Sequence, residues 1–277
     1  MKVILADYLG FCYGVKRAIR LARSSAPEQN GTACTLGPII HNPQMVERLA
    51  QEGVGLVNSI AELPDESTVI IRSHGVGPRI YHEIEERKLN IVDATCPHVR
   101  KAQMAANKLG KAGYMVVIIG EKQHPEVKSI FEWSGDRAVV IETEAEADAL
   151  PYYNKMGVVA QTTFSGEKFC SIVNHLLVKS NDIRILRTIC TATDQRQKAA
   201  ISLAEQVDLM LVIGGKNSAN TTRLAQLCAE KCKTYHIETV AELQDRWFDN
   251  IENIGITAGA STPDWVIREV YEKCQRI

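Results

Sequence analysis

The chain has 277 residues, of which 45% are hydrophobic and 23% are charged, a composition typical of a globular protein with a substantial core. Its 32 lysines and arginines nearly balance 33 aspartates and glutamates, and a net charge of -1 excludes the basic field that nucleic-acid binding requires. The longest apolar runs, at 115–119 and 209–213, are too short to span a bilayer, and no export signal is recognisable at the N-terminus. We therefore expect a cytoplasmic location, with no membrane and no nucleic-acid partner.

The apolar pattern predicts the same order of helices and strands three times along the chain. In chain order we expect a strand at 3–6, a helix at 15–22, strands at 32–36, 69–71 and 89–92, a helix at 99–109, strands at 114–119, 157–160 and 183–186, a helix at 195–204, and strands at 209–213 and 255–257. Helices that alternate with short strands indicate right-handed crossovers and parallel sheets, with all strand carboxyl ends on one edge. The predicted fold class is therefore α/β.

Three cysteines occupy matching positions, each after a predicted strand and before a predicted helix: Cys12, Cys96 and Cys190. Ligands bind at this edge of open α/β sheets, so three thiolates from separate repeats could hold zinc or an iron–sulfur cluster, although compact CxxC spacings are absent. The alternative is that they pack as small hydrophobic side chains. That alternative is our expectation for the other five cysteines, which fall within predicted helices or strands: Cys34, Cys170, Cys228, Cys232 and Cys274. Without an export signal, eight cysteines indicate free thiols or metal ligands and not a disulfide framework.

Polar motifs follow the remaining strand ends at regular distances from these cysteines. The separations from Cys12 to His41, from Cys96 to His124 and from Cys190 to Ser218 are almost equal. A second set, His74, Thr162 and Ser261, follows the same cysteines at separations that grow along the chain, as loop insertions would produce. The polar motifs therefore repeat with the cysteines.

The third repeat lacks its last strand, and the segment at 3–6 is a spare strand that could supply it. We therefore predict three pseudo-equivalent α/β units with small parallel sheets, at 13–96, 97–188 and 189–277, the last completed by the N-terminal strand within 1–12. This ring closure would bring all the strand-end motifs to one centre.

The polar side chains at the strand ends are hydrogen-bonding groups suited to phosphate oxygens, with helix N-termini beside them. They are His41, His74, His124, Thr162, Ser218, Asn220 and Ser261. A lone histidine is usually structural, but three at matched strand ends favour a binding site. Glu126 is the only carboxylate in these motifs: it could be a favourable charge at a helix N-terminus, or a proton donor in a water-poor pocket with Thr162 as a relay.

Six motifs, in order along the whole chain, resemble those of a single family. They are Gly10-Phe11-Cys12-Tyr13-Gly14-Val15, Ser73-His74-Gly75-Val76, Asp93-Ala94-Thr95-Cys96-Pro97, His124-Pro125-Glu126-Val127, Gln161-Thr162-Thr163 and Thr257-Ala258-Gly259-Ala260-Ser261. The family is 4-hydroxy-3-methylbut-2-enyl diphosphate reductase, also called IspH or LytB.

The resemblance implies a trefoil of three α/β units around one 4Fe-4S cluster that has three cysteine ligands and one open iron. It also implies the reductive dehydroxylation of (E)-4-hydroxy-3-methylbut-2-enyl diphosphate to isopentenyl diphosphate and dimethylallyl diphosphate, the last step of the non-mevalonate isoprenoid pathway. Cys12, Cys96 and Cys190 resemble the cluster ligands, Glu126 the proton donor and Thr162 its neighbour near the substrate. The diphosphate-binding set corresponds to His41, His74, His124, Ser218, Asn220 and Ser261.

No flavin or nicotinamide motif is recognisable, so electrons would come from an external carrier, by family expectation ferredoxin or flavodoxin. Two other functions remain open on the residues alone: an iron–sulfur sensor that binds a diphosphate without catalysis, and a zinc hydrolase that uses the same thiols. The presence of Glu126 favours catalysis, and metal analysis of anaerobically purified protein would separate iron from zinc.

Overall fold

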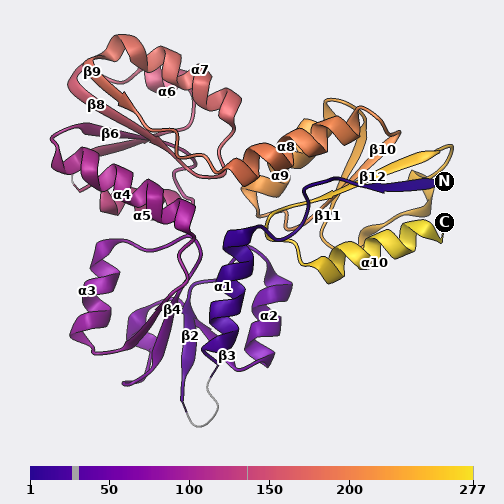
Figure 1. The fold of residues 1–277 in the computed structure, drawn as a ribbon, viewed down its shortest axis with the longest axis horizontal. Helices are drawn as coiled ribbons and strands as arrows, with labels where there is room; N and C mark the ends of the chain where they lie inside the picture. Colours follow the sequence, from indigo (N-terminus) through magenta and orange to yellow (C-terminus); the bar gives the residue numbers. More distant parts are fainter. Residues whose placement is uncertain (27–30, 136, 277) are drawn as a thin grey trace. The chain divides into compact units, whose positions relative to one another are not determined.

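The computed structural model describes residues 1–26, 31–135 and 137–276, and within these ranges it contains three four-stranded sheets with helices between successive strands (Figure 1). All the recorded strand pairs are parallel. The predicted α/β fold class with three small parallel sheets is confirmed. By its internal contacts the chain divides into two compact units. Unit 1 comprises Met1–Lys16, Ile40–Arg48 and Thr191–Ile277, and unit 2 comprises Arg17–Ile39 and Leu49–Cys190.

Unit 1 contains one sheet, here called sheet A, with the strand order β1-β12-β10-β11. Its strands are β1 (Lys2–Leu5), β10 (Leu209–Ile213), β11 (Lys233–Ile237) and β12 (Asn253–Ala258). Its helices are α8 (Thr191–Ala204), α9 (Ala219–Ala229) and α10 (Asp264–Gln275), with 3-10 turns η3 (Val240–Glu242) and η4 (Asp245–Trp247). The N-terminal strand pairs with β12, and Ile4 lies opposite Gly255. The predicted placement of this strand beside 255–257 is therefore confirmed.

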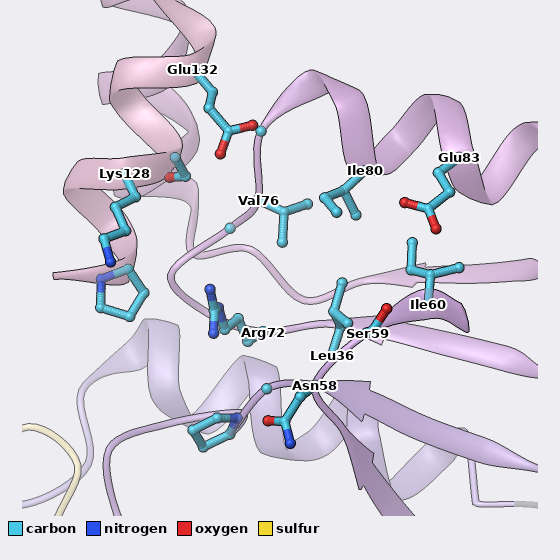
Figure 2. Close-up of a pocket in the computed structure, with 16 residues that line it drawn as sticks. Leu36, Asn58, Ser59, Ile60, Arg72, Val76, Ile80, Glu83, Lys128 and Glu132 are labelled. Carbon is cyan, nitrogen blue, oxygen red and sulfur yellow. The ribbon is translucent and has the colours of Figure 1, made fainter. Parts of the chain in front are cut away.

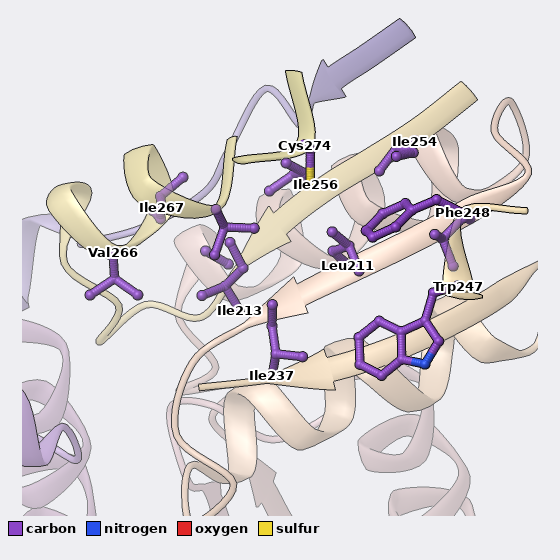
Figure 3. Close-up of a cluster of buried hydrophobic side chains, with 13 residues drawn as sticks. Leu211, Ile213, Ile237, Trp247, Phe248, Ile254, Ile256, Val266, Ile267 and Cys274 are labelled. Atoms are coloured by element: carbon purple, nitrogen blue, oxygen red, sulfur yellow. The ribbon is translucent and has the colours of Figure 1, made fainter. Parts of the chain in front are cut away.

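Sheet A is buried on both faces, as a parallel sheet requires. Successive side chains of β10 point to opposite faces, so Leu211 packs with α10 and η4, whereas Met210 packs with α8 and α9. Figure 3 shows the first of these layers, in which Val266, Ile267 and Cys274 of α10 face the strands. The two layers hold the carboxyl ends of β10 and β12, from which the polar motifs of unit 1 begin.

Unit 2 contains sheet B, with the order β3-β2-β4-β5, and sheet C, with the order β7-β6-β8-β9. The strands of sheet B are β2 (Ala33–Leu36), β3 (Val54–Val57), β4 (Thr68–Ile71) and β5 (Asn90–Asp93). Those of sheet C are β6 (Met115–Ile119), β7 (Ala138–Ile141), β8 (Tyr153–Ala160) and β9 (Ser180–Ile185). The helices are α3 (Pro78–Glu86), α4 (Pro97–Lys111), α5 (Pro125–Trp133), α6 (Glu144–Asp148) and α7 (Gly166–Leu176), with 3-10 turns η1 (Ile60–Glu62) and η2 (Leu177–Lys179).

Two further helices, α1 (Tyr13–Ser24) and α2 (Pro43–Gln51), contain residues of both units. In unit 2, α4 and α5 cover one face of sheet C and α6 and α7 cover the other. Helix α5 also contacts the segment after β4 of sheet B, because Trp133 Nε1 donates to Val76 O at 2.9 Å. Within the described ranges, no helix combines the length and the apolar character needed to cross a membrane.

Candidate active site

The three cysteines predicted as ligands share one backbone environment. The amide of each donates to a carbonyl just beyond the end of the neighbouring strand in its own sheet: Cys12 to Ala260 at 3.2 Å, Cys96 to Ser73 at 2.9 Å and Cys190 to Thr162 at 2.8 Å. The repeat inferred from sequence spacing therefore exists as a repeated hydrogen bond at three strand ends.

The same bonds correct one detail of that repeat. They make Thr162 the counterpart of Ser73 and Ala260, whereas spacing had matched Thr162 with His74 and Ser261. The difference of one residue arises because loop lengths vary between the repeats, and spacing alone does not reveal where a loop gains a residue.

A helix begins directly after each of these cysteines, at Tyr13, Pro97 and Thr191. The carbonyl of Cys12 accepts from Lys16 N at 2.9 Å and that of Cys96 accepts from Arg100 N at 2.9 Å, so both form part of a first helical turn. The N-terminus of a helix carries partial positive charge, which suits an anionic ligand atom such as a thiolate sulfur.

Two arginines hold the loops that lead into these cysteines. Arg196 of α8 is only 4% exposed and donates to Gly10 O at 2.6 Å, which anchors the turn before Cys12. Gly10 has a φ of 71°, a conformation that favours glycine. Arg17 of α1 donates to Thr95 O at 3.1 Å, directly before Cys96. The sequence analysis missed both arginines, because each acts on a segment far away in the chain.

The other cysteines differ chemically from these three. Burial raises the pKa of Cys228 to about 12 and that of Cys274 to about 11, and burial also raises the pKa values of Cys34 and Cys232. Such groups remain protonated thiols at neutral pH and are poor metal ligands. None of the eight cysteines, all of which lie in the described ranges, is in a disulfide. Cys12, Cys96 and Cys190 are partly exposed, so these three fit a metal or an iron–sulfur cluster best.

Two expectations for the remaining cysteines were wrong. Cys170 is exposed on α7 instead of packed in a core, and Cys232 lies in the bend between α9 and β11 instead of within an element. Neither position belongs to a strand-end motif.

Glu126 combines deep burial with a raised pKa. It lies in the first turn of α5 and is 2% exposed. The backbone N–H of Thr162 donates to its Oε1 at 2.6 Å, and the Thr162 hydroxyl donates to its Oε2 at 2.9 Å. Burial raises the pKa of Glu126 to about 7 although both of these bonds oppose the shift, and the charge of Glu121 raises it further. The carboxyl can therefore exchange a proton near neutral pH.

Two of the predicted histidines lie beside one another next to the first turn of α5. His124 caps α5, and its Nδ1 accepts from Glu126 N at 3.2 Å, so the proton of the neutral ring is on Nε2. The His74 and His124 rings meet edge to face, with 5.4 Å between their centroids. His124 therefore carries its ring donor on Nε2, and its ring lies next to that of His74.

The buried side chains of Gln103 and Ser129 connect His74 to helix α5 by hydrogen bonds. The Ser129 hydroxyl lies 3.1 Å from His74 O and 2.8 Å from Glu126 O, and Gln103 Nε2 donates to Ser129 Oγ at 3.0 Å. Ser129 thus joins the segment after β4 to helix α5. Sequence reasoning gave no role to Gln103 or Ser129, because their positions within helical patterns resemble ordinary interior positions.

Unit 1 contains the other predicted binding residues. Ser218 caps α9, and its hydroxyl accepts from Thr221 N at 3.4 Å. Ser218, Asn220 and Ser261 are 6%, 7% and 8% exposed. Asn220 Nδ2 is buried and has no hydrogen-bond partner among the described residues. An unsatisfied buried donor is costly, and an anionic ligand oxygen would satisfy it.

His41 also belongs to unit 1, but it does not occupy the position equivalent to His124. Helix α2 is capped by the next residue, because Asn42 Oδ1 accepts from Met45 N at 2.8 Å. Asn42 is therefore the structural counterpart of the caps His124 and Ser218, which sequence spacing had assigned to His41. The predicted convergence of the sites in units 1 and 2 on one centre stays a prediction.

Comparisons with known proteins agree on a single family. A model of the LytB protein family matches residues 3–275. The 4-hydroxy-3-methylbut-2-enyl diphosphate reductase of Syntrophotalea carbinolica is 50% identical over 275 residues, which cover 99% of this chain and 98% of that protein. The enzyme of the same name from Geotalea uraniireducens is 49% identical over 278 residues, which cover 100% and 98%.

Solved structures extend this similarity to the whole fold. A structure of (E)-4-hydroxy-3-methyl-but-2-enyl diphosphate reductase, described as the terminal enzyme of the non-mevalonate pathway, is 43% identical, with a TM-score of 0.76 and full coverage of both chains. The Plasmodium falciparum E-1-hydroxy-2-methyl-but-2-enyl-4-diphosphate reductase is 28% identical, with a TM-score of 0.93 over 98% of this chain and 87% of that one. The similarity along the whole length shows that the chain belongs to the LytB family of 4-hydroxy-3-methylbut-2-enyl diphosphate reductases.

Proposed function

We propose that this chain reduces (E)-4-hydroxy-3-methylbut-2-enyl diphosphate to isopentenyl diphosphate and dimethylallyl diphosphate, as the last enzyme of the non-mevalonate pathway. The observation that carries the proposal is the buried carboxyl of Glu126, with a pKa of about 7, held by Thr162 in the helix turn that His124 caps. A binding protein without catalysis has no need of a buried acid poised near neutrality, because burial of a titratable group costs stability.

The cofactor in this proposal is one 4Fe-4S cluster bound by Cys12, Cys96 and Cys190. Their partial exposure and their positions at helix starts support the assignment, as do the raised pKa values of four of the other cysteines. With three protein ligands, such a cluster supplies electrons and one open iron that can act as a Lewis acid. The residues around it must then bind the diphosphate, exclude water and deliver protons.

Loss of the substrate's hydroxyl requires two electrons and two protons: one proton converts the hydroxyl into water and the other is added to carbon. Glu126 is the proposed source of the first. At pH 7 about half of the Glu126 side chains are protonated, given a pKa of about 7. The Thr162 hydroxyl, 2.9 Å from Oε2, can rotate to accept from the protonated acid, so it keeps the carboxyl oriented in both protonation states.

The diphosphate is proposed to bind to His41, His74, His124, Ser218, Asn220 and Ser261. Two features support this set. His124 caps α5 through Nδ1 and carries its ring proton on Nε2, and Asn220 has a buried amide donor without a partner among the described residues. A hydrogen bond to a phosphate oxygen would satisfy the Asn220 amide.

The electrons are proposed to come from an external carrier such as ferredoxin or flavodoxin, since the sequence contains no recognisable motif for a flavin or nicotinamide. We also retain the cytoplasmic location as a proposal. Its support is that no disulfide joins any of the eight cysteines in the described ranges, as is usual in a reducing compartment.

One experiment tests the proposal directly. Protein purified anaerobically should contain about four irons per chain and little zinc. With a chemical electron donor it should convert the diphosphate substrate into the two prenyl diphosphates and water. Zinc without iron, together with hydrolysis of the diphosphate, would favour the zinc hydrolase instead. Iron without turnover would favour the sensor.

A further inference from the structure

Unit 2 contains a cavity of about 330 Å³, and its lining includes the residues directly after His74 and His124 (Figure 2). Its walls come from the ends of β2 and β4, the start of η1, helix α3 and one side of helix α5. The volume lies at the lower end of the range for small-molecule sites. None of the residues proposed for catalysis or for diphosphate binding lines this cavity.

Arg72, the residue directly after β4, lines this cavity, and Figure 2 shows it between Lys128 and the apolar side chains of Val76 and Leu36. Its Nε is buried and has no hydrogen-bond partner among the described residues. Burial lowers the pKa of Arg72 from its ordinary value. A Cβ on Gly37 would lie 2.4 Å from Arg72 Nη1, so the glycine leaves the room that the guanidinium occupies. Arg72 is half-buried as a residue, and among the described residues its Nε lacks the partner that a buried cationic donor normally has.

The rest of the cavity is apolar on one side. Figure 2 shows Val76, Ile80, Leu36 and Ile60 together on the side of Arg72 that faces away from Lys128. Two carboxylates also line the cavity. Glu132 is exposed, so solvent screens it, and Glu83 lies beyond Ile80 at the far end. The cavity therefore has a charged end, formed by Arg72 with the exposed Lys128 and Glu132, and an adjoining aliphatic wall.

We propose that this cavity is a second ligand site for a short branched-chain alkyl phosphate or diphosphate. The phosphoryl oxygens bind to Arg72 and Lys128, and the aliphatic chain packs against Val76 and Ile80. Arginine is well suited to phosphoryl groups because its planar guanidinium offers paired donors. The products of the reductase belong to this chemical class, so the choice of ligand rests on the proposed function.

A ligand in the cavity would affect the active site because the lining residues are linked to the segments that carry His74 and His124. Arg72 is two residues before His74, and Ser129, which lines the cavity, lies 3.1 Å from His74 O. Pro125, also in the lining, follows His124 directly. A bound ligand would contact both segments and alter turnover without competing for the diphosphate residues.

The test is a calorimetric titration of anaerobically purified holoenzyme with dimethylallyl diphosphate. It is done without an electron donor and without substrate. We expect two equivalents of dimethylallyl diphosphate to bind, one at the active site and one in the cavity. Arg72→Met should weaken binding in the cavity at least tenfold, and Lys128→Ala at least threefold. Arg79→Met, which removes an exposed arginine of α3 outside the lining, should leave it unchanged.

Inorganic diphosphate should bind at least tenfold more weakly than dimethylallyl diphosphate, because it lacks the chain. Equal affinity for the two, or unchanged affinity in Arg72→Met, would overturn the proposal. If Arg72→Met does not fold, Lys128→Ala decides, since Lys128 is an exposed helix residue, and unchanged affinity there would overturn it as well. The titration requires no turnover, so its failure is distinguishable from a failure of the reductase assay.

Discussion

Replacing Glu126 by glutamine should make the protein more stable at high pH while it removes the proposed proton donor. The pKa of the carboxyl is raised from 4.5 to about 7 because the side chain is buried. A raised pKa in the folded state means that the contribution of this group to stability is fully present below pH 4.5 and is lost as pH rises through 7. Glutamine does not ionise, so the variant avoids that loss.

The size of the effect follows from the shift. At about 1.36 kcal/mol per pKa unit, the shift from 4.5 to about 7 means that ionisation of Glu126 lowers the free energy of unfolding by about 3 kcal/mol above pH 7. Below pH 4.5 the carboxyl stays protonated and this loss is absent. The glutamine amide can accept from Thr162 N through its oxygen and donate to the Thr162 hydroxyl, so both hydrogen bonds are retained. The difference between variant and wild type is therefore chiefly the cost of ionisation.

The assay is thermal unfolding of anaerobic wild type and Glu126→Gln at several values between pH 4.5 and 8.5. With roughly 2 °C per kcal/mol for a chain of this size, the Tm advantage of the variant should grow by roughly 6 °C across the range. Glu132→Gln, which alters an exposed carboxylate on the same helix, should show no such growth. In parallel, kcat of Glu126→Gln should fall by roughly 10²–10⁴. A Tm difference that does not change with pH would refute a raised pKa, and near-normal turnover would remove Glu126 as the donor.

Three other predictions test the ligands, the diphosphate site and sheet A. Replacing Cys12, Cys96 or Cys190 by serine should remove most of the iron and abolish activity. The control Cys170→Ser should change neither iron content nor activity. Iron retained in Cys190→Ser would contradict the assignment. His74→Ala should raise KM roughly 10- to 100-fold, since a charge-assisted bond contributes about 1.5–3 kcal/mol, and an alcohol analogue without the diphosphate should compete poorly with the substrate. Equal competition by that alcohol would exclude the site. Deleting strand β1 should lower hydrogen-exchange protection in β12 before it does so in sheets B and C, and equal protection in β12 with and without β1 would contradict its role.

The sequence was sufficient to predict the repeat and the placement of the N-terminal strand. Periodic apolar runs predict strands, and a repeat that lacks one strand beside a spare strand predicts the pairing of β1 with β12. Spacing also located the three cysteines whose amides make equivalent hydrogen bonds. It failed by one residue at Asn42 and at Thr162, because loop length and helix caps are set by local hydrogen bonds that spacing does not contain.

The electrostatics of the site could not be read from the sequence. Glu126 was recognisable as the only carboxylate in the polar strand-end motifs, but its pKa depends on its burial in the first turn of α5 against Thr162, which is a property of the packed structure. The same holds for Arg17 and Arg196, whose bonds to the loops before Cys96 and Cys12 join distant segments. Helical arginines of this kind give no local signal.

The pairing of β1 with β12 also governs the order in which the protein can be completed during synthesis. Strand β1 leaves the ribosome first, but its partner is among the last segments to emerge. Sheets B and C are formed by residues between β1 and β12. Both sheets can therefore assemble while β1 is still unpaired. Closing a contact over nearly the whole chain is slow, so sheet A, and the mature position of Cys12 next to Ala260, should be the last part of the protein to form. Under the proposed function, insertion of the cluster would then have to wait until sheet A has formed.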